Sequence, residues 1–114
     1  MIHYGVTKTA QIAVARGLAE LTKGTGVTVN TVLPGPTLSE GVGGFLKDLS
    51  KQNSQTVEEI EKQFFKNTRP TSILQRFIAP DEIAALVTYL SSDLSIATNG
   101  AAVRADGGVV KSAF

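Results

Sequence analysis

The feature that most limits the fold is a pair of short apolar runs that flank a long helical stretch. The run Val-Thr-Val-Asn-Thr-Val-Leu at residues 27–33 is rich in β-branched residues, and Pro-Gly-Pro at 34–36 ends it abruptly. A second run at about 101–105 leads into Asp-Gly-Gly at 106–108. A strand that returns after a helical crossover forms a βαβ unit, whose strands pair in parallel. The sequence therefore predicts an α/β fold in the order helix, strand, helices, strand.

Residues 4–23 have apolar side chains at the 3.6-residue period of an amphipathic helix. That stripe consists of Ala10, Val14, Leu18 and Leu21. Lys23 and Gly24 are typical of the last turn of a helix and its stop. We therefore expect a helix almost at residue 1, with no strand before it to pack on.

Two further helices are expected before the second strand. Thr56 and Glu59 form a capping-box pattern that opens the first of them. Pro80 stands at the first position of the other. The predicted apolar face of the earlier helix is Val57, Ile60 and Phe64, and the predicted buried stripe of the later one is Ile83, Leu86, Val87 and Leu90. Ahead of both, a run of glycines predicts a mobile loop followed by a short helix near residues 45–49; these glycines are Gly41, Gly43 and Gly44.

Two strands alone make a poor sheet. Parallel strands are normally buried on both faces inside larger sheets. The predicted elements supply neither further strands nor a strand for the first helix to cover. We therefore interpret the 114 residues as one partial domain, incomplete by itself.

Charge and composition exclude several classes of function. Eleven Lys and Arg residues against ten Asp and Glu give a net charge of +1, which is too balanced for a nucleic-acid or anionic-membrane surface. With no Cys and one His, disulfides, thiol nucleophiles and a zinc site of usual composition are not expected. No apolar stretch approaches the length of a membrane span, and no signal peptide is visible. The sequence predicts a cytoplasmic protein that binds neither nucleic acid nor membrane and holds no metal.

Tyr4 and Lys8 are four residues apart, so on a helix both side chains project from one face, one turn apart. A phenol is a poor base at neutral pH, but a nearby ammonium group favours the phenolate. Such a pair can supply general acid–base catalysis. On spacing alone, an exposed surface pair is the commoner explanation of so short a motif.

The turn after the first strand is a second candidate site. Ligands of open α/β sheets bind outside the carboxyl ends of the strands, which favours Pro34 and Gly35 as part of a pocket wall. An ordinary turn explains the same two residues equally well. Four aromatic residues leave a similar choice between a substrate cleft and packing in a core or an interface, of which packing is the safer interpretation. These residues are Phe45, Phe64, Phe65 and Phe77.

Taken in order, six short segments resemble the short-chain dehydrogenase/reductase family. They are Tyr4-Gly-Val-Thr-Lys8, Gly26-Val-Thr-Val-Asn30, Pro34-Gly35, Pro80-Asp-Glu-Ile-Ala84, Asn99-Gly100 and Asp106-Gly107-Gly108. The resemblance covers nearly the whole chain and corresponds to the C-terminal half of the family, from the Tyr-x-x-x-Lys helix onward. It implies a Rossmann-like, doubly wound parallel sheet that is incomplete without its N-terminal half. It also implies NAD or NADP as the cofactor.

The resemblance further implies roles for individual residues. Tyr4 matches the acid–base that exchanges a proton with the carbonyl or hydroxyl oxygen of the substrate. Lys8 matches the residue that assists this tyrosine and hydrogen-bonds the nicotinamide ribose. The loop that begins at Pro34 and Gly35 matches the one that contacts the nicotinamide carboxamide.

The same loop carries two candidate hydroxyl groups. Ser39 occupies the place that a threonine usually holds in the family, and Thr37 is the nearby substitute, so the resemblance implies that both contact the cofactor. Residues 38–75 match the variable substrate-binding lid. The Asp-Gly-Gly segment at 106–108 matches a mainly structural position at the end of the last strand.

The sequence also departs from the family. It has no Thr-Gly-x-x-x-Gly-x-Gly turn, no Asn-Ala-Gly segment and no serine shortly before Tyr4. We therefore expect an NAD(P)-dependent oxidoreductase acting on a small carbonyl or alcohol substrate, in a polypeptide roughly twice this long, with these 114 residues inactive alone. The alternative is a non-catalytic fragment that acts only as an oligomerising module. A homo-oligomer, either a dimer or a tetramer, is expected.

Overall fold

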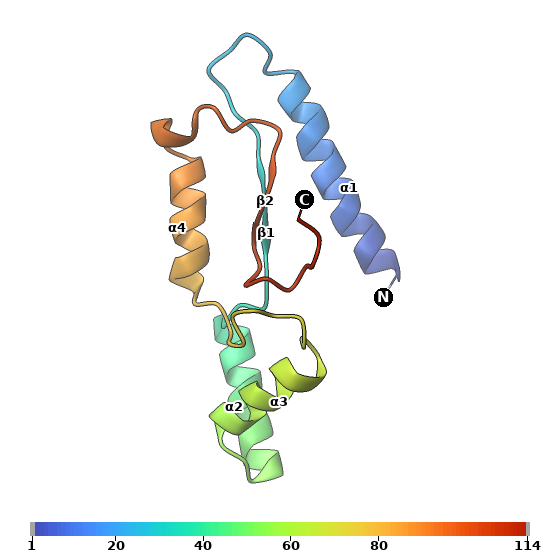
Figure 1. The fold of residues 1–114 in the computed structure, drawn as a ribbon, viewed down its shortest axis with the longest axis vertical. Coiled ribbons are helices and arrows are strands. Elements are labelled where there is room, and N and C mark those ends of the chain that lie inside the picture. Colours follow the sequence, from blue (N-terminus) through green and yellow to red (C-terminus); the bar gives the residue numbers. More distant parts are fainter. Residues whose placement is uncertain (1, 114) are drawn as a thin grey trace. The chain divides into compact units, whose positions relative to one another are not determined.

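The computed structural model describes residues 2–113 (Figure 1). In chain order its elements are α1 (Ile2–Glu20), β1 (Thr31–Pro34), α2 (Glu40–Asn53), α3 (Val57–Asn67), α4 (Pro80–Leu90), the 3-10 helix η1 (Asp93–Ser95) and β2 (Ala102–Ala105). The chain divides into two compact units. The first unit comprises the residues up to 33 and residues 85–104, and the second comprises residues 34–84 and those from 105 onward.

Strands β1 and β2 pair in parallel, as the βαβ pattern predicts. The Thr31 N–H donates to the Ala101 carbonyl over 2.8 Å, and the Gly35 N–H donates to the Ala105 carbonyl over 3.0 Å. The offset between the two strands is therefore the same at both ends, which is the register of parallel strands. Figure 1 shows the two strands side by side. No residue of either strand is buried, which is unusual for parallel strands and fits the expectation of an incomplete domain.

Helix α1 begins slightly earlier than predicted and ends at Glu20 rather than Lys23. The chain then leaves the helix through tight turns, in which the Leu21 N–H donates to the Leu18 carbonyl, and Gly24 adopts a φ of 77°. A positive φ favours glycine, which accounts for Gly24 in these turns, but the helix stops earlier than predicted, at Glu20. The apolar stripe of this helix is largely uncovered, since Val14 is 61% exposed and Leu18 is 49% exposed.

Two asparagines of the first unit hold the starts of its strands. The Asn30 side chain donates to the Thr98 carbonyl and accepts from the Ala101 N–H. The Asn99 carboxamide oxygen accepts from the Val29 N–H over 2.8 Å. Each amide thus replaces a backbone partner beside the ladder, which accounts structurally for the Asn in two of the sequence motifs.

The predicted buried stripe of α4 is wrong. Ile83, Leu86 and Leu90 are half-buried, Val87 is 45% exposed, and no residue of the helix is buried. An apolar stripe becomes buried only when another element covers it, and among residues 2–113 nothing covers this one fully.

The mobile loop predicted at the glycines of residues 41–44 is also wrong, because these residues form the first turns of α2. Ser39 is the N-cap, and its hydroxyl accepts a hydrogen bond from the Val42 N–H. Glycine costs roughly 1 kcal/mol in a helix interior. Packing of Leu46 in the core, with Val42 and Leu49 against it, offsets that cost.

The core of the second unit lies between α2, α3 and the segment that follows them. Its buried residues are Leu46, Ile60, Phe65 and Phe77. The Phe64 ring stacks on the Phe77 ring with centroids 5.0 Å apart, and Phe65 meets Phe77 edge-to-face at 5.1 Å. The predicted capping box opens α3, since Thr56 and Glu59 each accept from the backbone N–H of the other.

Candidate functional site

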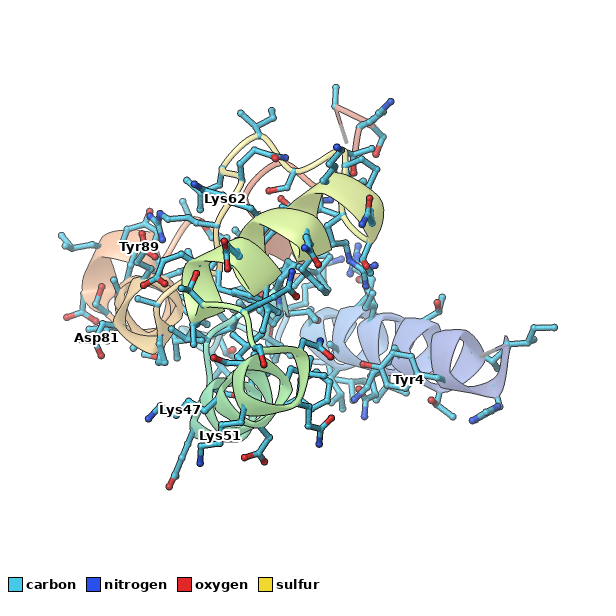
Figure 2. The ribbon with its side chains drawn as sticks, turned by 90° about the horizontal axis from the view of Figure 1, so that it is seen from below. Tyr4, Lys47, Lys51, Lys62, Asp81 and Tyr89 are labelled. Carbon is cyan, nitrogen blue, oxygen red and sulfur yellow. The ribbon has the colours of Figure 1, made fainter. Side chains whose placement is uncertain are left out.

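In the first unit, Tyr4 and Lys8 lie on one face of α1. The Lys8 ammonium nitrogen is 5.7 Å from the centroid of the Tyr4 ring, and it donates to the Gln11 side chain over 3.3 Å. Tyr4 is 54% exposed, and Figure 2 shows its side chain on the outside of the helix. The phenol is therefore accessible to a reacting group, with a cation one helical turn away.

In the second unit, the loop that follows β1 is held by backbone hydrogen bonds. The Ile78 N–H donates to the Pro36 carbonyl over 2.8 Å, and the Leu38 N–H donates to the Ile78 carbonyl over 2.9 Å. The Thr37 hydroxyl donates to the Gly35 carbonyl over 2.9 Å. These bonds fix the loop on both sides of Thr37, as a binding site requires.

Gly35 lies directly against the backbone of Asp106. A Cβ atom at this position would come within 2.5 Å of the Asp106 carbonyl oxygen, so only glycine fits. The Asp106 carboxylate accepts from the backbone N–H groups of Gly108 and Val110, both over 3.0 Å. Gly107 and Gly108 adopt φ angles of 65° and 76°. The Asp-Gly-Gly segment is thus a fixed turn that braces the loop.

A pocket of about 420 Å³ opens beside this loop, entirely within the second unit. We call it the aromatic pocket. It is lined by Pro34, Gly35, Pro36, Thr37, Val42, Phe45, Leu46, Phe64, Arg69 and Phe77. Its volume is in the range of small-molecule sites, and its lining is mostly apolar with few polar groups.

The four phenylalanines divide between core and pocket. Phe65 is buried in the core at 1% exposure, and Phe77 belongs to the core while also lining the pocket. Phe45, which is 61% exposed, and Phe64 line the pocket as well. Core packing thus describes Phe65 best, whereas the other three also face the pocket.

The two candidate hydroxyl residues have different positions. Thr37 lines the aromatic pocket. Ser39 is exposed and its hydroxyl caps α2, over 3.4 Å to the Val42 N–H. Of the two, Thr37 is the one that lines the pocket.

Comparisons with known proteins show the family to which this chain belongs. A family model described as enoyl-(acyl carrier protein) reductase matches residues 1–110. The chain belongs to the short-chain dehydrogenase/reductase family. An oxidoreductase of Bacillus subtilis, YvaG, is 59% identical over 114 residues, which is all of this chain and 43% of YvaG.

Solved structures of short-chain dehydrogenases confirm the Rossmann-like α/β fold. L-sorbose reductase from Gluconobacter frateurii, complexed with NADPH and L-sorbose, has a TM-score of 0.82 and 27% identity over 96% of this chain and 40% of its own. A short-chain dehydrogenase family protein from Francisella tularensis has a TM-score of 0.76 and 29% identity, over 93% of this chain and 42% of its own. This member of the family therefore spans less than half the length of the relatives it matches.

Sequence reasoning about this short-chain dehydrogenase chain missed Arg69 as a site residue. Arg-Pro at 69–70 predicts only the end of a helix, whereas the Arg69 side chain lines the aromatic pocket. Its guanidinium donates to the Thr68 carbonyl over 2.9 Å and lies 6.0 Å from the Phe64 ring centroid. One sequence feature could have indicated Arg69. It follows Phe64 and Phe65 by about one helical turn, at the end of an apolar helix face.

Residues 2–113 bring together no group of three or more His, Cys, Asp or Glu side chains suited to a metal ion. Across the same residues, no helix combines the length and apolar character needed to span a membrane.

Proposed function

We propose that this chain is part of an NAD(P)-dependent oxidoreductase that interconverts a carbonyl group and an alcohol. The accessible Tyr4 phenol, with the Lys8 ammonium one turn away in a chain of this family, is the observation that carries the proposal. The NADPH in the complex of the related L-sorbose reductase supports the choice of cofactor.

In this proposal Tyr4 is the proton donor during carbonyl reduction and the proton acceptor during alcohol oxidation. Lys8 keeps a positive charge on the same face of α1 as the phenol ring, and in this proposal that charge stabilises the anion that forms when the proton leaves. Lys8 also binds the cofactor ribose. A bound NAD(P) supplies or accepts the hydride.

The loop of residues 34–37 fits a nicotinamide ring. Residues 34–37 form one wall of the aromatic pocket, and in this proposal the nicotinamide lies against that wall while the apolar remainder of the pocket takes the substrate. The Thr37 hydroxyl already donates to the Gly35 carbonyl, so its oxygen is left to accept from the carboxamide N–H of the cofactor. Ser39 supports the same loop by capping α2. Residues 38–75 form the substrate-binding lid.

We further propose that the 114 residues alone do not catalyse the reaction. The chain lacks a glycine-rich turn for the pyrophosphate and lacks the serine that would polarise the substrate oxygen. It would therefore contribute proton transfer and part of the nicotinamide and substrate sites. It would not contribute the contacts to the pyrophosphate, whose binding energy holds the cofactor in place.

A fluorescence titration with NADH and NADPH tests the proposal. The samples are the 114-residue chain and a chimera in which these residues replace the matching segment of YvaG. We expect saturable binding by the chimera and none by the chain alone, while circular dichroism shows both to be folded. A folded chimera that binds neither dinucleotide would refute the proposed cofactor role, and binding by the chain alone would refute its incompleteness.

A second candidate role, association with other copies of the chain, is favoured by the uncovered apolar residues of α1. Ile2 is 86% exposed, Val6 62%, Val14 61% and Leu18 49%. Apolar residues gathered along one helix favour association. Light scattering on the 114-residue chain would detect a dimer or tetramer, and a monomer at all concentrations would rule this role out.

A further inference from the structure

We infer that Arg69 makes the aromatic pocket a site for substrates that carry an anionic group, such as a carboxylate, on an otherwise apolar carbonyl or alcohol compound. This inference rests on the proposed function for the reacting carbonyl, but the anion site follows from the second unit alone.

The charge distribution in the pocket is the first argument. Of the ten residues that line it, Arg69 is the one charged residue and Thr37 carries the one side-chain hydroxyl. The other side chains are apolar or absent. A ligand that fills this pocket thus meets apolar surface with a single positive group, and its best complement is an apolar body with a single negative charge.

The hydrogen-bonding state of Arg69 is the second argument. Ion pairs join Arg16 to Glu20 and Arg76 to Glu82. Among residues 2–113 no salt bridge joins a carboxylate to Arg69, and its guanidinium donates one hydrogen bond, to the Thr68 carbonyl. A guanidinium has five N–H donors in a planar fork. Donors therefore remain for a ligand, in the geometry that binds carboxylates with two parallel hydrogen bonds.

The third argument is that Arg69 is positioned by its neighbours. Its guanidinium lies 6.0 Å from the centroid of the Phe64 ring. Phe64 is in turn stacked on Phe77 and meets Phe65 edge-to-face at 5.1 Å. A cation held against an aromatic face loses less side-chain freedom when it binds a ligand than a fully mobile one does.

Arg76, the other arginine of the second unit, differs from Arg69 because it is paired with a carboxylate. Arg76 lies in the same unit, yet both of its terminal nitrogens bind the Glu82 carboxylate at 2.7 Å. The N–H donors of the Arg76 guanidinium that could bind a carboxylate already bind Glu82. Arg69 is thus the arginine of the second unit that is left to recognise an external anion.

Ligand binding to the 114-residue chain tests the inference without requiring turnover. The probes are 2-, 3- and 4-oxopentanoate and their methyl esters, which have the same carbon skeleton with and without the charge. Binding is followed by NMR, with the resonances of Thr37 and Phe64 locating the ligand. At least one acid should bind roughly 10-fold more tightly than its ester, as expected for a hydrogen-bonded ion pair that is partly exposed.

Variants then assign the preference to Arg69. Arg69→Met should abolish the preference of the acid over the ester, and Arg69→Lys should retain part of it. Lys62→Met removes one positive charge from the exposed surface of α3 (Figure 2), and it should leave the preference unchanged. The two-dimensional NMR spectrum of each variant checks that the second unit remains folded.

Several outcomes would overturn the inference. They are equal binding of every acid and its ester, a preference that survives in Arg69→Met, or a loss of equal size in Lys62→Met. Adenosine 2′,5′-bisphosphate, which carries phosphates like those of NADP, tests whether Arg69 binds a phosphate of the cofactor instead of a substrate carboxylate. If it binds at Arg69 more tightly than every oxo acid, the site recognises the cofactor and the substrate assignment is wrong. None of these results depends on whether the YvaG chimera binds dinucleotides, so the two proposals fail separately.

Discussion

The glycine at position 35 illustrates how a single residue can fix a binding loop. Its role depends on the absence of a side chain, because the Asp106 backbone fills the space where a Cβ would lie. The loop that begins there continues to Thr37 along one wall of the aromatic pocket. A change at Gly35 would therefore alter the stability of the second unit and the shape of the pocket together.

We predict that Gly35→Ala lowers the free energy of unfolding by about 1–3 kcal/mol, the usual cost of forcing a methyl group into a filled site. Gly44→Ala is the matched control, because a Cβ at Gly44 meets nothing within 4 Å. Gly44 lies inside α2, so this variant should be more stable by about 0.5–1 kcal/mol. Urea denaturation measures both values. A Gly35→Ala protein as stable as the wild type would show that the close approach to Asp106 is not real.

For single residues, the sequence predicts contacts between side chains that are close along the chain. The helical period places Tyr4 and Lys8 on one face, and the structure agrees. The spacing of Thr56 and Glu59 likewise predicts the capping box that is observed. Arg69 was missed because its approach to residues 34–37 depends on how the intervening chain folds, which no local pattern records.

Among the elements, helix α4 has an ion pair in its first turn that makes the stability of the fold depend on pH. The Arg76 side chain hydrogen-bonds the Glu82 carboxylate, and the Ala79 N–H donates to it as well. Together these contacts lower the pKa of Glu82 from 4.5 to about 2. A lowered pKa in the folded state stabilises the fold above the unfolded value, and this contribution disappears as the pH falls from about 4.5 toward 2.

We predict that Glu82→Gln is less stable than the wild type at neutral pH, and that the difference shrinks as the pH falls through this range. Thermal unfolding at a series of pH values measures it. Arg76→Met removes the partner and should cause a similar loss at neutral pH, with little further loss in the double variant. A stability difference that stays constant from pH 7 to pH 2 would contradict the proposed role of this ion pair.

Helix starts were easier to predict than helix packing. Pro80 and Thr56 mark the beginnings of α4 and α3 correctly, because capping depends on a few neighbouring residues. The glycines at the start of α2 predicted a loop, yet they are helical because the packing of Leu46 outweighs their low helix propensity. The α4 stripe was expected to be buried, but the described residues do not cover it.

For the whole molecule, the sequence correctly indicates the family, and the incomplete domain stays a prediction that the following observations support. The two parallel strands have no buried residue, and several apolar side chains of α1 are exposed. The chain matches 43% of the length of YvaG. These observations share one physical cause, since a parallel sheet needs covered faces that this chain does not itself supply.

In the proposed nicotinamide-dependent carbonyl reduction Tyr4 transfers the proton, and one pair of variants tests this role directly. The YvaG chimera is assayed with Tyr4→Phe and Tyr89→Phe, which remove the hydroxyl groups of the two tyrosines of this chain, one on α1 and one on α4 (Figure 2). Turnover is followed by nicotinamide absorbance over a panel of carbonyl substrates.

We predict that Tyr4→Phe lowers kcat by about 100- to 10,000-fold, as expected for loss of a general acid. Dinucleotide affinity should change by less than about threefold in this variant, because the lost interaction is made in the transition state. Tyr89→Phe should retain full activity. A Tyr4→Phe chimera that reduces carbonyl substrates as fast as the unmodified chimera would contradict the account.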